Sequence, residues 1–311
     1  MKPGVLLAID LPPAHIAALR SRYDLCHETS HAGRLALPEL VRAGVRALIG
    51  NGSTEVSAAV LEGLPNLGLV CTRGVGHEGV DLGLIRARGI MLCNGAGANA
   101  DTVADHAVAL MLAALRGIPA ADALVRSGGW RTTTTLPPIA HRKRLGVLGL
   151  GDIGRRIAQR VAGFEMAVAY HSRRRVPGVA WDYAATPLAL AARSDILVVV
   201  LPGGAATRHM IGGPELAALG PSGLLVNVGR GSVVDTRALI EALHAGRIGA
   251  AALDVVEGEP DIPAALLAAP NVTLTPHIAG RSPESSEAGV ALLMANLTAF
   301  FAGQALLTPV A

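Results

Sequence analysis

One segment constrains the fold of this chain more than any other. Residues 145–170 run from a short apolar stretch through three glycines in the spacing G-x-G-x-x-G to a helical pattern and a second apolar stretch. Strand, glycine turn, helix and strand, in this order, form the context of a dinucleotide-binding unit. The segment therefore predicts a parallel sheet that carries a nucleotide cofactor at its glycine turn.

Each glycine of this turn has its own expected task. Gly149 allows the tight turn, Gly151 lets the backbone approach a pyrophosphate, and Gly154 lets helix and strand pack closely. Asp152 and Ile153 stand at the expected helix N-terminus, where free N–H groups and the helix dipole favour an anion. We therefore predict that Gly149, Gly151, Asp152 and Ile153 bind the cofactor.

The residues after the second apolar stretch indicate which nucleotide binds. NAD-binding folds usually place Asp or Glu roughly 20 residues beyond the first glycine, where the carboxylate accepts from the ribose 2′-OH. This chain instead has His171, Ser172 and the arginines Arg173, Arg174 and Arg175. A carboxylate repels a 2′-phosphate, whereas hydroxyl and guanidinium groups bind it. We predict NADP(H) as the preferred cofactor, NAD(H) as a second one, and Ser172, Arg173 and Arg174 as its ligands; the alternative is a solvated basic loop.

Composition argues against several classes of protein. Hydrophobic residues make up 51% of the 311 residues, which is enough for a sizeable core, and the net charge is only +3. Aromatic residues make up 3%, too few for platforms that stack single-stranded nucleic acid. No apolar run approaches the ~20 residues of a membrane span, and no Cys and His spacing fits a zinc site. Three cysteines without a C-x-x-C pair are typical of reduced thiols. We expect a cytoplasmic protein without nucleic-acid, membrane or metal partners.

Short apolar runs alternate with helical segments before residue 98 and again after residue 145, which predicts parallel sheets covered by helices. Between them lies a long helix, 101–116, that Asp101 or Thr102 can cap. Its apolar residues surround most of its circumference, so we expect it to be buried between domains or in a dimer contact.

Charged residues follow three of the later apolar runs. Arg230, Glu259 and His277 each stand just beyond such a run, where ligands bind in open α/β sheets. Hydride transfer to a ketone leaves negative charge on its oxygen, and His277 is the natural proton donor. We expect Glu259 to orient the imidazole, and Arg230 to hold a substrate carboxylate and polarise the ketone. Each residue alone is also typical of an ordinary loop, but together they predict a catalytic site.

Several segments resemble the D-isomer-specific 2-hydroxyacid dehydrogenases. Residues 226–235, 254–260 and 275–280 are similar to the three catalytic signatures of that family. Residues 73–76 and 99–106 resemble its substrate loop and its linker, so the resemblance covers nearly the whole chain.

This resemblance implies a fold, an activity and an assembly. The fold class would be α/β, with two flavodoxin-like or Rossmann-like, doubly wound parallel-sheet domains joined by two linker helices. The substrate-binding domain would comprise residues 1–98 and 282–311, and the NAD(P)-binding domain residues 99–281. The protein would be an NAD(P)-dependent oxidoreductase that acts on the CH–OH group of 2-hydroxy acids, and it would form a homodimer.

The resemblance also assigns site residues. Catalysis falls to Arg230, Glu259 and His277, and the N–H groups of Val75 and Gly76 would bind the substrate carboxylate. Asp254 would hold the nicotinamide amide. The remaining predicted cofactor contacts are Thr102, Pro202, Thr207 and Val228.

Two departures from the family pattern concern specificity. The segment 77–79 replaces the usual polar pair after the substrate loop, and Gly203 and Gly204 stand where bulkier residues are common. The basic loop and the arm 129–131 are similar to glyoxylate and hydroxypyruvate reductases, which favours a small 2-keto acid of that kind as substrate. The alternatives are a cofactor-sensing, non-enzymatic binding protein of the same fold and a phosphite-type dehydrogenase.

Overall fold

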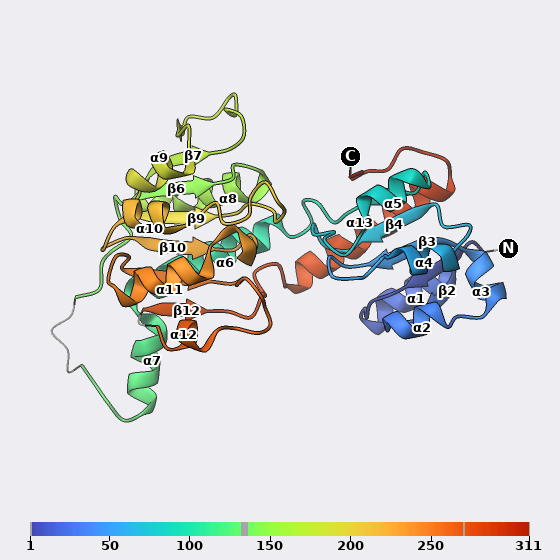
Figure 1. The fold of residues 1–311 in the computed structure, drawn as a ribbon, viewed down its shortest axis with the longest axis horizontal. Coiled ribbons are helices and arrows are strands. Elements are labelled where there is room, and N and C mark those ends of the chain that lie inside the picture. Colours follow the sequence, from blue (N-terminus) through green and yellow to red (C-terminus); the bar gives the residue numbers. More distant parts are fainter. Residues whose placement is uncertain (1, 132–135, 270, 311) are drawn as a thin grey trace. The chain divides into compact units, whose positions relative to one another are not determined.

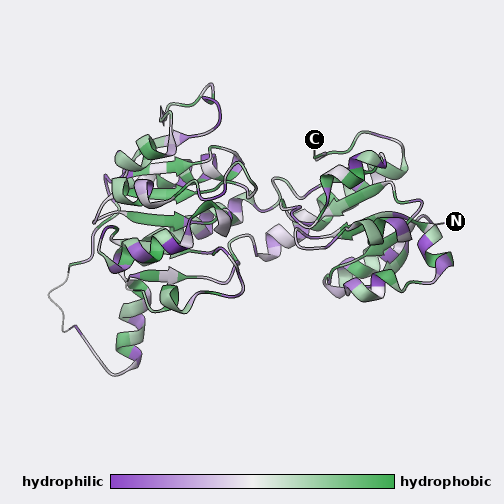
Figure 2. Ribbon diagram, in the orientation of Figure 1, coloured by the Kyte–Doolittle hydropathy of each residue, from purple (hydrophilic) through white to green (hydrophobic). Residues whose placement is uncertain are grey.

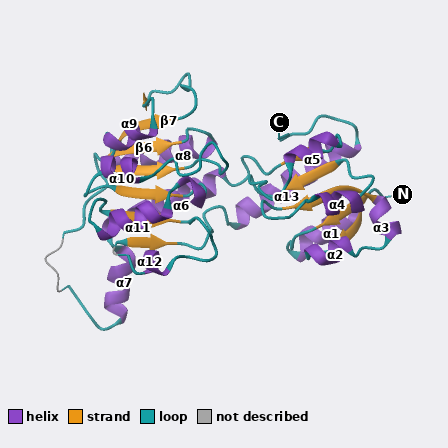
Figure 3. Cartoon of the chain, in the orientation of Figure 1, coloured by secondary structure: helices purple, strands orange, loops and turns teal. Residues whose placement is uncertain are grey.

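The computed structural model describes residues 2–131, 136–269 and 271–310. The chain forms two compact units, Met1–Asn99 with Ser282–Ala311, and Ala100–Arg281. Each unit is built on a parallel sheet with helices packed against it (Figures 1 and 3). This confirms the predicted α/β fold class.

The first unit contains a five-stranded sheet in the order β2-β1-β3-β4-β5, and every pair is parallel. Its strands are β1 (Gly4–Leu7), β2 (Asp24–His27), β3 (Val45–Gly50), β4 (Leu69–Thr72) and β5 (Met91–Cys93). Its helices are α1 (Pro13–Arg22), α2 (His31–Leu35), α3 (Glu39–Gly44), α4 (Ala58–Gly63), α5 (Leu82–Ala87) and α13 (Pro283–Phe301). The sequence did not predict β2, α2 or α3, because this stretch has no continuous apolar run.

Helix α13 returns the end of the chain to the first unit. The Ser282 hydroxyl accepts a hydrogen bond from the Ser285 amide and caps the helix, and Pro283 occupies the first turn. Val290, Leu293 and Leu297 on its inner face join the core that covers one side of the sheet. The helix is therefore held in this unit by its buried face.

The second unit contains a seven-stranded parallel sheet in the order β12-β11-β10-β9-β6-β7-β8. Its strands are β6 (Arg144–Leu148), β7 (Ala167–His171), β8 (Asp182–Tyr183), β9 (Ile196–Val199), β10 (Leu224–Asn227), β11 (Ala250–Leu253) and β12 (Val272–Leu274). Its helices are α6 (Ala100–Arg116), α7 (Ile118–Arg126), α8 (Asp152–Arg160), η1 (Val161–Phe164), α9 (Pro187–Ala192), α10 (Gly213–Leu219), η2 (Gly231–Val233), α11 (Thr236–His244) and α12 (Ala264–Leu267).

Helices cover both faces of this second sheet. In β9, Ile196 and Val198 join a core that includes residues of α6 and α8, whereas Leu197 and Val199 join a core with residues of α10 and α11. Side chains of a strand alternate between faces, so a strand buried on both sides is apolar throughout. Figure 2 shows this hydrophobic character along the strands of both sheets.

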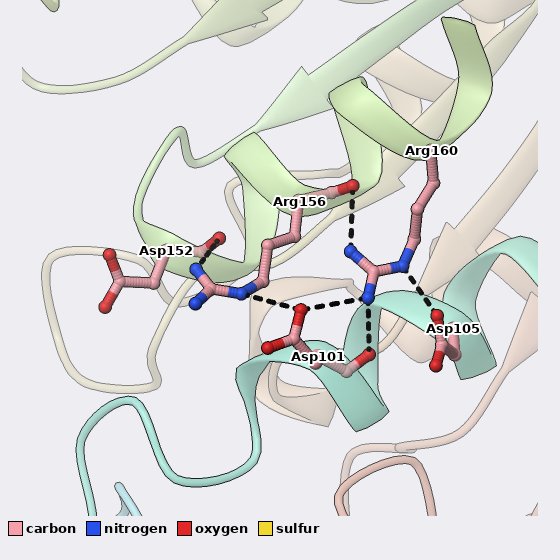
Figure 4. A network of polar contacts seen from close by, with 5 residues as sticks. All are labelled: Asp101, Asp105, Asp152, Arg156 and Arg160. Carbon is pink, nitrogen blue, oxygen red and sulfur yellow. Dashed lines mark hydrogen bonds and ion pairs between the residues drawn. The ribbon is translucent and has the colours of Figure 1, made fainter.

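Helix α6 differs from expectation at its N-terminus. It begins at Ala100, so Asp101 lies inside the first turn, and the prediction that Asp101 or Thr102 caps the helix was wrong. One face is buried against α8 and β10–β12, whereas Val108 and Leu112 are only partly buried. Asp101 instead accepts hydrogen bonds from Arg156 and Arg160 of α8 (Figure 4). The Asp101 carboxylate therefore links α6 to α8.

Within the described ranges, no single helix is long and apolar enough to cross a membrane. Helices α6 and α7 reach that length and apolarity only as a pair, which is bent by 62°.

Candidate active site

The glycine turn between β6 and α8 has the geometry that its spacing predicts. Gly149 has a φ of +106°, a backbone conformation that favours glycine. A Cβ on Gly154 would lie 2.1 Å from the Gly149 carbonyl oxygen, so only glycine allows this packing. Around Gly151, at the start of α8, a Cβ would meet open space. This space beside a helix N-terminus fits the approach of a pyrophosphate.

The basic loop lies directly beside this turn. The Gly149 amide donates to the His171 carbonyl at 2.9 Å and thereby ties the turn to the end of β7. The Ser172 hydroxyl donates to the Arg174 carbonyl at 2.6 Å and folds the loop. Arg173 and Arg174 are exposed. Their guanidinium groups are therefore available to an anion next to the dinucleotide turn.

Glycines place Arg230 between two neighbouring strand ends. A Cβ on Gly229 would lie 2.6 Å from the Leu201 carbonyl oxygen beyond β9. A Cβ on Gly231 would lie 2.1 Å from the Val256 carbonyl carbon beyond β11. The backbone on each side of Arg230 thus packs directly against an adjacent loop, which only glycine permits.

The buried Asn227 side chain closes the turn that carries Arg230. Its amide nitrogen donates to the Arg230 carbonyl at 3.0 Å, and its oxygen accepts from the Gly229 amide at 3.0 Å. The Arg230 guanidinium itself is half-buried and donates to the Gly229 carbonyl at 2.8 Å. The position of the guanidinium is therefore set by local contacts as well as by the sheet.

Glu259 and His277 form a hydrogen-bonded pair. Oε1 of Glu259 contacts Nδ1 of His277, and Oε2 of Glu259 accepts from the Val256 amide at 3.0 Å. The carboxylate is thus fixed by its own loop while it contacts the imidazole. The His277 side chain is 50% exposed, so the ring is accessible from outside this unit. A carboxylate at Nδ1 orients an imidazole and stabilises its protonated form.

Asp254 is buried beneath the His277 loop. Its carboxylate accepts from the Thr275 hydroxyl at 2.6 Å and from the amides of Ile278 and Ala279, both at 2.9 Å. Its backbone carbonyl accepts from the His277 amide at 2.9 Å. Family resemblance predicted that Asp254 holds the nicotinamide amide. In the structure, this carboxylate shapes the loop that carries His277, and its contact with the nicotinamide amide stays a prediction.

The other predicted cofactor residues lie around the same strand ends of the second unit. The Thr207 hydroxyl donates to the Pro202 carbonyl at 2.7 Å and closes the loop after β9. Val228 is buried directly after β10, and Thr102 is half-buried in the first turn of α6. These positions stay predictions as cofactor contacts.

The predicted substrate loop, residues 73–76, belongs to the first unit. The Val75 carbonyl accepts from the Asn94 side-chain amide at 2.9 Å, and the Gly74 carbonyl accepts from the Gly95 amide at 2.9 Å. Among the described residues, the amides of Val75 and Gly76 have no hydrogen-bond partner. Two such N–H groups in one turn are suited to a carboxylate.

Sequence reasoning missed two histidines near the site. His106 on α6 contacts Thr275 and Asp254. His209 contacts Glu257, two positions before Glu259. Both histidines meet partners far away in the sequence, so no local pattern signals them.

Across the described residues, no group of three His, Cys, Asp or Glu side chains is arranged to hold a metal ion.

Comparisons with known proteins agree with this geometry. Residues 108–279 match the family model described as "D-isomer specific 2-hydroxyacid dehydrogenase, NAD binding domain". The chain is 39% identical to glyoxylate/hydroxypyruvate reductase A of Arabidopsis thaliana over 308 residues, which cover 99% of this chain and 98% of that protein. It is 37% identical to 2-ketogluconate reductase of Gluconobacter oxydans, with 99% of each chain covered.

A solved structure shows the same fold. The NADPH-dependent glyoxylate/hydroxypyruvate reductase of Sinorhizobium meliloti, crystallised with NADP and malonate, superimposes with a TM-score of 0.92 at 36% identity. The match covers 100% of this chain and 97% of that one. The chain therefore belongs to the D-isomer-specific 2-hydroxyacid dehydrogenases and is an NAD(P)-dependent oxidoreductase.

Proposed function

We propose that the protein is an NADPH-preferring 2-keto acid reductase, a D-2-hydroxyacid dehydrogenase with a small substrate such as glyoxylate or hydroxypyruvate. The observation that carries this proposal is the Glu259–His277 pair in the unit that also holds Arg230 between strand ends. A carboxylate-bound imidazole and a guanidinium are the groups that proton delivery and binding of a keto acid require.

The residues divide the reaction between them. NADPH, when bound, supplies the hydride to the ketone carbon. His277, with Nδ1 bonded to Glu259, donates the proton on Nε2 to the ketone oxygen, so that the product is a hydroxyl group and a neutral imidazole. Glu259 stabilises the imidazolium before this transfer. Arg230 binds the substrate carboxylate and polarises the ketone, and the amides of Val75 and Gly76 bind the carboxylate as well.

The preference for NADPH rests on the basic loop. Arg173 and Arg174 are exposed beside the dinucleotide turn, and this loop carries no carboxylate that would repel a 2′-phosphate. The reductase from Sinorhizobium meliloti that shares this fold is named as NADPH-dependent. Gly149, Gly151, Asp152 and Ile153 would hold the pyrophosphate, with Ser172 beside the phosphate on the ribose.

The test is the absorbance of the reduced nicotinamide. NADPH or NADH is offered with glyoxylate, hydroxypyruvate, hydroxyphenylpyruvate and 2-ketogluconate. We expect the highest kcat/KM with NADPH and one of the two smallest acids. Faster turnover of 2-ketogluconate would refute the small substrate, faster turnover with NADH would refute the cofactor preference, and binding of NADPH without turnover of any acid would refute the reductase.

We also propose that the protein is a homodimer. Helix α7 has no buried residue, and Ile118 and Val125 on it are 53% and 51% exposed, with Trp130 beyond it at 73%. Covering these side chains with a second copy would remove apolar surface from water. Light scattering should give the mass of two chains, and Val125→Asp should give that of one. The cytoplasmic location stays a prediction.

A further inference from the structure

His106 on α6 contacts the loop that carries His277. Its Nε2 lies 3.0 Å from the Thr275 hydroxyl oxygen and 3.5 Å from Oδ1 of Asp254, although 169 positions separate His106 from Thr275. The His106 side chain is 21% exposed and that of Asp254 is 1% exposed. This is therefore a largely buried polar contact between a helix and the site.

The donors and acceptors in this cluster can be assigned. Thr275 has one hydroxyl hydrogen, and the oxygen of Asp254 at 2.6 Å takes it. The Thr275 oxygen can then only accept from His106, so His106 carries a proton on Nε2. His106 is thus the outer donor of a chain in which Thr275 donates to the carboxylate of Asp254, which also accepts from the amides of Ile278 and Ala279.

The same carboxylate shapes the backbone at His277. His277 has a φ of +54°, which is uncommon for a residue with a side chain. Its amide donates to the carbonyl of Asp254, and the next two amides donate to the carboxylate of Asp254. The left-handed conformation that presents the imidazole therefore depends on Asp254 staying in place.

We propose that His106 is a positioning residue for His277, acting through Thr275 and Asp254. This inference rests on the proposed role of His277 as proton donor. His106 fixes the Thr275 hydroxyl, which fixes the carboxylate, which holds the backbone turn at His277. Without His106, the Thr275 oxygen loses its donor and the carboxylate loses a neighbouring N–H group, so the imidazole sits less firmly against Glu259.

Helix α6 is a rigid base for this role. One residue before His106, Asp105 accepts from Arg160 of α8 at 2.6 Å, and Asp101 accepts from both Arg156 and Arg160 (Figure 4). Helix α6 is thus anchored to α8 through Asp101 and Asp105, and to the His277 loop through His106. The two contacts can be removed separately.

The experiment compares His106→Ala, His106→Gln, Thr275→Val and the double variant His106→Ala/Thr275→Val. Asp105→Ala is the matched control. Glutamine keeps an N–H donor at a similar reach, whereas alanine removes it. Turnover is measured on the keto acid that the wild-type enzyme reduces best, together with the NADPH dissociation constant. Proton NMR of the imidazole N–H bonded to Glu259, assigned by its loss in His277→Gln, is recorded on each folded variant.

We expect His106→Ala to lower kcat by about five- to a hundredfold, the effect of leaving the buried Thr275 oxygen without its donor, while the NADPH dissociation constant stays unchanged. In His106→Ala, the His277 imidazole N–H signal should shift or broaden. His106→Gln should restore both kcat and this signal, and Asp105→Ala should leave the signal unchanged. His106→Ala and Thr275→Val should be non-additive because they act in one chain of contacts. An unchanged His277 signal in His106→Ala, or full additivity, would overturn the proposal.

The NMR readout separates this inference from the proposed function. If the wild-type protein reduces no keto acid, the proposed function fails, while the His277 signal still decides whether His106 positions that ring. If His106→Ala does not fold, His106→Phe takes its place, because phenylalanine keeps the bulk of the ring without an N–H group, and the same shift of the His277 signal is then expected.

Discussion

Replacing Gly231 by Ala should separate Arg230 from the loop that leads to Glu259. A Cβ at this position would lie 2.1 Å from the Val256 carbonyl carbon and 2.3 Å from the Glu257 nitrogen. Ordinary contact begins at 3.4 Å, so the two backbones must move apart by about 1.3 Å. Both neighbours are backbone atoms, and no flexible side chain can yield instead.

This displacement sets the size of the effect. A shift of about 1 Å in a catalytic group can cost roughly a hundredfold in rate, and forcing an extra methyl group into a packed site costs about 1–3 kcal/mol of stability. We therefore expect Gly231→Ala to lower kcat/KM about a hundredfold while NADPH still binds, because the dinucleotide turn lies elsewhere in the unit.

The assay is steady-state reduction of the best keto acid, with thermal unfolding and an NADPH titration on the same samples. Gly163→Ala is the matched control, since a Cβ there meets nothing within 4 Å and the residue is exposed. Activity of Gly231→Ala within about twofold of the wild-type enzyme would refute the reasoning that glycine is needed for this close approach.

Three further predictions concern single side chains. His277→Ala should lower kcat about a hundredfold or more with unchanged NADPH affinity by fluorescence titration, and turnover like that of the wild-type enzyme would remove His277 from the mechanism. Arg173→Ala should raise the KM for NADPH about tenfold and leave NADH unaffected; equal loss with both would make the arginine structural. Hydrogen bonds from Arg144 hold the pKa of Asp195 below its usual value. A carboxyl group whose pKa is lowered by folding stabilises the folded state at pH values above its pKa in the unfolded chain. This stabilisation is lost as the pH falls through the pKa of the folded state. Asp195→Asn should thus lower Tm at pH 7, and the deficit should shrink below about pH 4; a constant deficit in thermal scans would contradict this.

The sequence alone determined the α/β fold class and predicted where the candidate site lies. Apolar runs and the glycine turn are local patterns, and burial on both faces makes a strand apolar throughout. Because parallel strands end at the same edge of a sheet, residues just beyond those ends can be grouped from their positions in the sequence. That rule brought together Arg230, Glu259 and His277, and the fold places the last two in contact.

Only the tertiary structure decided which distant groups meet. Asp101 looked like a helix cap, yet it pairs with arginines of α8, and these also hold its pKa below the usual value, Arg160 foremost by hydrogen bonding. Cys71 and Cys93 carry no sequence signal of pairing, yet their sulfurs lie 3.1 Å apart on adjacent strands. His106 meets Thr275 across 169 positions. Such contacts depend on strand order and helix placement, which the packing of the whole unit sets and no local pattern encodes.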